Sequence, residues 1–249
     1  MNAKPAGNRK ATKALDSSSN KGMLYTVLAL VAVAVVVLGG VIWFNRDGGQ
    51  ATPVTFGETS DANIELTDTG VIAVGDPSAP TVQIWEDFMC PACAQFEGQF
   101  GEQIASAVQE GEVRTEFHIL NFQNRASGSG EYSTRAIAAM QCVAAGESVE
   151  TFFSVKNSYF AQQPTGGGDL SPDELADSAE AAGASEDTAA CVREVENGDA
   201  MDKAEDTAKN AQRTAQDVIG RVSTPSVAHD GTEVDWNNPT WLDEIISAA

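Results

Sequence analysis

Two cysteines three positions apart, Cys90 and Cys93, are the residues whose type and spacing indicate chemistry most directly. A Cys-x-x-Cys pair between a strand and a helix is the arrangement of a thiol–disulfide active site. Residues 82–85 are apolar and β-prone, and residues 94–97 read as the first turns of a helix. Unpaired N–H groups and the positive dipole end at the start of that helix favour a thiolate there. We therefore predict that Cys90 is the attacking thiol and that Cys93 resolves the mixed disulfide.

A zinc site is the alternative use for such a pair of cysteines. Zinc needs about four protein ligands, and the remaining candidates show no paired spacing. We therefore predict a protein without a metal or a cofactor, and we expect both histidines to be structural or surface residues. The remaining candidates are Cys142, Cys191, His118 and His229.

The other two cysteines, Cys142 and Cys191, lie far apart in the sequence. In an exported protein, such a distant pair predicts a structural disulfide. Closing a loop of this length stabilises a fold by about 4 kcal/mol in the chain-entropy model. The alternative, a second redox pair that relays electrons, stays open at this point.

The composition limits the size of the fold and its partners. A chain of 249 residues is long for one small domain and suits one domain with an insertion. The net charge is −21, and from Ile64 onward nine basic residues stand against 32 acidic ones. Because nucleic-acid binding needs a basic face, we predict no nucleic-acid partner. An acidic surface suits solubility in a cation-rich exterior.

The first 62 residues divide into three segments. Residues 1–23 form a polar, basic tail, and residues 24–44 are an uncharged stretch of mostly Leu, Val and Ala. That stretch matches the roughly 20 residues that cross a bilayer as a helix. Residues 45–62 follow as a linker. We predict a single-pass transmembrane anchor in the cell membrane, with the tail in the cytoplasm and the catalytic domain extracytoplasmic; a cleaved signal peptide is the alternative, although Trp43–Arg46 is a poor cleavage site.

Residues 63–249 carry β patterns at both ends and helical patterns between them. Residues 129–219 show several helix signals and no strand signal, which predicts a helical insert between two β regions. Residues 171–174 form a capping box with proline at the first helical position, a strong helix start. The predicted strands lie at 82–85, at 113–120 and in a hairpin over 222–236. The predicted helices run from the cysteines to about 108, over 132–145, over 149–160, from 172, from 185, over 199–218 and over 239–247.

Three segments together carry a family resemblance. They are Gly75–Pro80, Asp87–Cys93 with Phe96, and Ser223–Val227. On these segments the chain resembles the DsbA-like thioredoxin-fold proteins of bacterial envelopes, in particular membrane-anchored members. The resemblance implies an α/β thioredoxin fold with an inserted helical domain and an exported thiol–disulfide oxidoreductase. It also implies a cis bond between Thr224 and Pro225, opposite Cys90, which leaves the backbone of Thr224 free to bind an extended substrate peptide.

The active-site stretch departs from the family pattern at two positions. Family members often carry His or Tyr where this chain has Ala92, and a His there makes a stronger oxidant. Many relatives also carry a buried acid six residues before the first cysteine, where this chain has Ile84. Glu86 and Asp87 lie nearer the cysteines and either substitutes for it, but strand alternation does not decide which one points inward. Pro91 keeps the first helical turn tight without losing a needed N–H.

These observations predict an oxidase that introduces disulfides into envelope or secreted proteins. Its predicted partners are cysteine-containing exported proteins as substrates, a membrane redox partner that resets the active site, and the membrane itself through the N-terminal helix. Two alternatives remain: a reductase or isomerase that uses the same pair, and a non-catalytic thioredoxin-fold binding module in which the pair is structural.

Overall fold

The computed structural model describes residues 62–249. The predicted basic tail, the predicted anchor and all but the last residue of the predicted linker lie outside these residues. Within residues 62–249, none of the helices has the length and apolar character that crossing a membrane requires.

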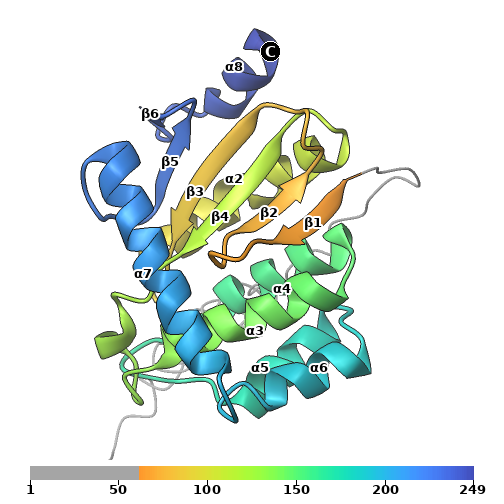
Figure 1. The fold of residues 1–249 in the computed structure, drawn as a ribbon, viewed down its shortest axis with the longest axis vertical. Coiled ribbons are helices and arrows are strands. Elements are labelled where there is room, and N and C mark those ends of the chain that lie inside the picture. Colours follow the sequence, from red (N-terminus) through yellow and green to blue (C-terminus); the bar gives the residue numbers. More distant parts are fainter. Residues whose placement is uncertain (1–61) are drawn as a thin grey trace, which may run out of the picture. The chain divides into compact units, whose positions relative to one another are not determined.

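A six-stranded mixed sheet forms the centre of the fold (Figure 1). Its spatial order is β1-β2-β4-β3-β5-β6, with β3 and β4 parallel and the other neighbours antiparallel. Parallel neighbours need a crossover connection, and helix α2 (Pro91–Gln109) supplies it between β3 and β4. The strands are β1 (Asn63–Leu66), β2 (Ile72–Gly75), β3 (Thr81–Glu86), β4 (Arg114–Ile119), β5 (Ser226–His229) and β6 (Thr232–Val234).

Five α-helices and a short 3-10 helix (Asn124–Ala126) fill the connection between β4 and β5, so the predicted α/β fold with a helical insert is confirmed. In Figure 1, α3 to α6 gather beside the sheet and α7 runs from this group along the sheet. The capping box at Ser171 is present, and Ser185 caps the helix that follows. The helices are α3 (Tyr132–Gly146), α4 (Val149–Ala161), α5 (Pro172–Ala181), α6 (Glu186–Arg193), α7 (Ala200–Ile219) and the C-terminal α8 (Trp241–Ala248).

Both faces of the central strand β3 are covered. Val82 and Ile84 belong to the main core, which includes the buried side of α2. Trp85 lies in a second, smaller core with Ala211 of α7, and its Nε1 donates to the carbonyl oxygen of Ala211 at 3.2 Å. Because successive side chains of a strand point to opposite faces, Glu86 continues the side of Val82 and Ile84. The last residue of β3 therefore carries a carboxylate into the main core.

The insert has its own covalent link and its own aromatic cluster. A disulfide joins Cys142 of α3 to Cys191 of α6, with their Cα atoms 5.9 Å apart. Phe152 packs against Phe117 of β4, with ring centroids 5.7 Å apart, and further along α4 the ring of Phe160 also faces away from the insert. Aromatic residues of α4 therefore attach the insert to the sheet.

Candidate active site

The two cysteines lie where β3 gives way to α2. Cys90 is the residue before the first turn of the helix, with φ −83° and ψ 114°, and its carbonyl oxygen accepts from the N–H of Cys93 at 3.0 Å and of Ala94 at 3.2 Å. Both thiols are free; Cys90 is 4% exposed and Cys93 is fully buried. The pair therefore lies at a strand-to-helix junction, as the sequence predicts, with the first thiol slightly exposed and the second fully buried.

Hydrogen bonds at the position of Cys90 lower the pKa of its thiol. A hydrogen bond from Cys93 contributes most, and together with Thr224 and the N–H groups of Cys93 and Ala92 it outweighs partial burial, so the pKa of Cys90 falls from 9.0 to about 5. In its protonated form, Cys90 Sγ donates to the carbonyl oxygen of Thr224 at 3.5 Å. The buried Thr224 hydroxyl has no other hydrogen-bond partner among the described residues, so it is available to the thiolate.

Cys93 is shifted in the opposite direction. Burial is the largest cause that raises its pKa, and the hydrogen bond it gives to Cys90 and the charges of Glu86 and Cys90 raise it further. At neutral pH the reduced pair therefore holds one thiolate, on Cys90, and one thiol, on Cys93. Cys90 is therefore both the nucleophile and a good leaving group, while Cys93 stays protonated.

The loop before β5 forms the wall opposite Cys90. The peptide bond between Thr224 and Pro225 is cis. Ser226, the next residue, pairs with Trp85 of β3, so the strand pairing itself brings this loop to the cysteines. Thr224 and Pro225 thus lie where the sequence predicts them, with the carbonyl oxygen of Thr224 in contact with Cys90 Sγ.

Three buried charged side chains form a cluster near Cys93 that the sequence did not predict. Lys156 of α4 places its Nζ 2.8 Å from Glu86 Oε2 and 2.6 Å from Glu97 Oε1. All three side chains are at least nine-tenths buried, and the ammonium also lies 4.4 Å from the ring centroid of Phe117. Glu86 comes from the strand, Glu97 from the helix of the cysteines and Lys156 from the insert. The trio therefore joins the two parts of the fold at the active site.

One lysine cannot neutralise two carboxylates, and this imbalance sets the protonation of the trio. Burial and the charge of Glu97 raise the pKa of Glu86 well above its ordinary value, despite the attraction of Lys156. Burial opposes the charge of Lys156, but the two carboxylates outweigh it and raise the pKa of the lysine. Lys156 is therefore charged and Glu86 tends to hold a proton. A proton thus resides close to Cys93, whose pKa responds to the charge of Glu86.

The sequence contains only part of the pattern that would predict this trio. Because both faces of β3 are covered, apolar residues occupy successive positions and the alternation that would orient Glu86 is lost. Lys156 interrupts the apolar face of α4 four residues after Phe152 and four before Phe160. A lysine in the middle of such a face indicates a buried acidic partner, and this feature of the sequence could have predicted the ion pairs of Lys156.

Asp87, the other candidate acid, has a different environment. Its carboxylate accepts from the N–H of Met89 at 2.9 Å, from the N–H of Gln123 at 3.0 Å and from the hydroxyl of Ser133 at 2.6 Å. It is fully buried, and the residues 62–249 give it hydrogen-bond donors but no ion pair. Burial raises the pKa of Asp87 from 3.8 to about 6, against these hydrogen bonds, and the charge of Cys90 adds to the rise. Glu86 and Asp87 both point inward, one beneath Cys93 and one behind the turn of Cys90.

A family model described as thioredoxin matches residues 67–248, which include both active-site cysteines, the cis proline and the insert. The chain belongs to the thioredoxin family.

Two solved structures of thiol–disulfide proteins are similar to this chain. MdbA, a thiol-disulfide oxidoreductase from Corynebacterium diphtheriae, is 26% identical, with a TM-score of 0.65, over 79% of this chain and 100% of that one. DsbA from Mycobacterium tuberculosis in its reduced form is 28% identical, with a TM-score of 0.54, over 76% of this chain and 91% of that one. The predicted DsbA-like resemblance and the predicted thiol–disulfide oxidoreductase are thereby confirmed.

A curated relative places a similar segment within a larger protein. The serine/threonine-protein kinase PknE of Mycobacterium tuberculosis is 28% identical over 209 residues, or 82% of this chain. This chain spans only 36% of the length of that relative. The likeness therefore concerns about a third of the kinase.

The buried Asp87 gives this thioredoxin-family fold a measurable dependence on pH. Its folded pKa of about 6 exceeds the ordinary 3.8, so the folded state binds the proton more tightly, and this contribution is present at low pH and lost as the pH rises from 3.8 to about 6. We expect wild-type stability to fall by up to about 3 kcal/mol relative to Asp87→Asn across that window. Urea unfolding of both proteins below and above the window measures the difference. The difference is smaller in the oxidised protein, which lacks the Cys90 thiolate, and parallel curves for the two proteins contradict the prediction.

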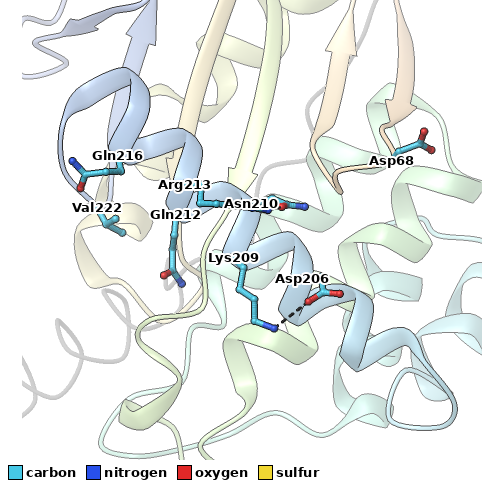
Figure 2. Close-up of a pocket in the computed structure, with 8 residues that line it drawn as sticks. All are labelled: Asp68, Asp206, Lys209, Asn210, Gln212, Arg213, Gln216 and Val222. Atoms are coloured by element: carbon cyan, nitrogen blue, oxygen red, sulfur yellow. Dashed lines mark hydrogen bonds and ion pairs between the residues drawn. The ribbon is translucent and has the colours of Figure 1, made fainter.

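A solvent-open hollow of about 870 Å³ lies along α7, and Figure 2 shows the side chains that line it. Lys209, Arg213 and Gln216 of the helix line it together with Val222, and Lys209 pairs with Asp206 at 3.0 Å within the same helix. Neither the cysteines nor Thr224 reaches it. This polar hollow does not contribute to the thiol chemistry.

The two histidines lie in the sheet of the thioredoxin-family fold. His118 stacks on Trp85, with ring centroids 4.7 Å apart, and His229 Nδ1 lies 2.8 Å from the carbonyl oxygen of Thr81. Within residues 62–249, no group of three His, Cys, Asp or Glu side chains has a geometry that would hold a metal ion.

Proposed function

We propose that the protein is an exported thiol oxidase that introduces disulfides into envelope or secreted proteins through the Cys90–Cys93 pair. The observation that supports this most is the opposite shift of the two thiols: the pKa of Cys90 falls to about 5 while that of Cys93 rises. A stabilised thiolate stabilises the reduced pair, which makes the oxidised pair a stronger oxidant.

The cycle begins when a substrate thiolate attacks Cys90 Sγ of the oxidised pair. The Cys90–Cys93 bond breaks, a mixed disulfide forms between the substrate and Cys90, and Cys93 leaves with the electron pair. A second substrate thiolate then attacks the substrate sulfur of the mixed disulfide and expels the Cys90 thiolate. The substrate has lost two electrons and the pair has gained them. In the opposite direction, Cys93 attacks the mixed disulfide and resolves it.

The buried trio supports this cycle by donating a proton to Cys93 and accepting it back. A raised pKa makes Cys93 take up a proton as it leaves the disulfide, and protonated Glu86 is the nearby acid whose charge is coupled to it. Glu86 supplies that proton and accepts it again when the pair is reoxidised. Lys156 then compensates the extra negative charge. In this assignment, Glu86 takes the place of the family's acid at the position of Ile84.

The surroundings of the active site follow from the same proposal. Thr224 and Pro225 bind the substrate as an extended peptide beside Cys90, and a membrane redox partner withdraws two electrons to restore the disulfide. Residues 24–44 anchor the chain in the membrane, with residues 63–249 outside. The disulfide between Cys142 and Cys191 is structural, since an oxidising compartment preserves it.

A reductase or isomerase is the second candidate. The observation that favours it is Ala92, because the family resemblance associates a His at this position with stronger oxidants. The same two cysteines then run in the reverse direction, with electrons supplied from across the membrane.

The reduction potential of the Cys90–Cys93 couple separates the two candidates. Equilibration with glutathione mixtures is expected to give a value well above the roughly −270 mV of thioredoxin. In parallel, the oxidised protein is expected to restore activity to reduced, unfolded ribonuclease A. A potential near −270 mV without recovery of ribonuclease overturns the oxidase assignment and favours the reductase.

A further inference from the structure

One side chain of the insert reaches the backbone of the active-site turn. Gln163, two residues beyond the end of α4, donates from Nε2 to the carbonyl oxygen of Phe88 at 2.9 Å and to that of Cys90 at 3.0 Å. Both acceptors belong to the turn that connects β3 to α2, more than 70 residues earlier in the chain. A single amide group thus spans the turn that ends in the attacking thiol.

The position of Gln163 is fixed from both sides. Its own N–H donates to the carbonyl oxygen of Phe160 at 3.2 Å. The ring of Phe160 stacks on Phe88, with centroids 4.5 Å apart, and both rings are at most 4% exposed. The segment that carries Gln163 and the turn that receives its hydrogen bonds are therefore packed against each other, so little conformational freedom is lost when the two hydrogen bonds form.

The carbonyl of Cys90 matters because it orients the first turn of the helix. It also accepts from the N–H of Cys93 and of Ala94. The N–H groups of Ala92 and Cys93, in the same turn, are among those that stabilise the Cys90 thiolate. Rotating the Cys90 carbonyl changes ψ of Cys90 and moves Sγ relative to these donors. Holding that carbonyl in place thus holds the sulfur within reach of the groups that stabilise its charge.

We propose that Gln163 is a positioning residue for Cys90, through which the helical insert sets the geometry of the attacking thiol. This inference rests on the proposed role of Cys90 as that thiol. It assigns the insert a part in the chemistry in addition to supplying Lys156. The hydrogen bonds of Gln163 reach the backbone of the turn and not the reacting sulfur, so it acts through that backbone.

The adjacent residue provides a matched control. Gln162 also donates two hydrogen bonds from Nε2, to Ser158 Oγ at 3.0 Å and to Ser178 Oγ at 2.7 Å, but both acceptors lie within the insert. The two glutamines therefore differ in what their hydrogen bonds reach, although Gln162 is also the more exposed of the two.

The experiment compares Gln163→Ala with Gln162→Ala in the full chain. Ultraviolet absorbance of the Cys90 thiolate against pH is expected to show a midpoint about one pH unit higher in Gln163→Ala, a tenfold change in proton affinity. Gln162→Ala is expected to keep the wild-type midpoint. Gln163→Glu, which replaces the donor with an acceptor and adds negative charge, is expected to shift the midpoint further upward. If Gln163→Ala fails to fold, Gln163→Met keeps the length of the side chain without its donors.

Two results overturn the proposal: a wild-type midpoint in Gln163→Ala, or equal shifts in the two alanine variants. A Cys90→Ser variant that retains exchange activity would instead contradict the proposed function. The two failures are therefore distinguishable, because the titration reports on the geometry of the turn and the serine variant reports on the identity of the reacting thiol.

Discussion

Replacing Cys90 with serine is expected to abolish thiol–disulfide exchange, with a loss of at least about 10³-fold in kcat/KM, because the other free thiol among the described residues, Cys93, is fully buried and has a raised pKa. Replacing Cys93 with alanine is expected to give a different result. The Cys90 thiolate still attacks a substrate disulfide, but no second thiol is present to resolve the mixed disulfide. This variant therefore accumulates covalent complexes, which non-reducing gels and mass spectrometry detect.

The control for this pair of variants is the double replacement of Cys142 and Cys191 by alanine. These residues are already joined, so the double variant is expected to lose stability and to keep exchange activity at temperatures where it is folded. Complexes that still form when Cys90→Ser is combined with Cys93→Ala are incompatible with Cys90 as the attacking thiol. A Cys90→Ser variant that changes only stability, together with no covalent complexes in Cys93→Ala, points to a binding module in which the pair is structural.

Replacing Lys156 with methionine is expected to destabilise the fold by about 3–5 kcal/mol at neutral pH. The lysine is 1% exposed and is the cation within 2.8 Å of both Glu86 and Glu97, so its removal leaves buried negative charge without compensation. The pKa of Glu86, already raised, rises further in the variant. Because protonation then removes the buried charge, the destabilisation is expected to shrink as the pH falls. Guanidinium unfolding of both proteins at neutral and acidic pH measures the effect.

Two control variants make this test specific to the buried trio. Lys203→Met breaks an exposed pair with Asp199, 2.9 Å apart, and is expected to leave the unfolding midpoint unchanged. Combining Lys156→Met with Glu86→Gln and Glu97→Gln removes all three ionisable groups and is expected to recover most of the lost stability. Equal midpoints for Lys156→Met and Lys203→Met are the result that sinks the prediction.

Local pattern was enough to predict the elements that carry the cysteines, but not the groups that surround them. The CxxC spacing, the capping box at Ser171 and the hairpin pattern over 222–236 are short-range signals, and the structure has the helix starts and the hairpin where they predict them. Lys156 and Gln163 act on the active site across about 60 to 75 residues of sequence, and nothing in the local periodicity of α4 encodes which strand it meets. The orientation of Glu86 was hidden because β3 is covered on both faces, which removes the alternation that a half-exposed strand would show.

The attachment of the insert also limits how far this enzyme can be reduced in size. A trimmed protein that joined β4 to the Thr224–Pro225 loop before β5 would keep both cysteines and the cis proline, yet it would lose the cation that pairs with Glu86 and Glu97. The ring of Phe88 would lose the cover of Phe160, and its backbone would lose the amide of Gln163. The insert is thus not a detachable module added to a complete catalyst, and an engineered minimal version has to retain at least α4 and the residues that follow it.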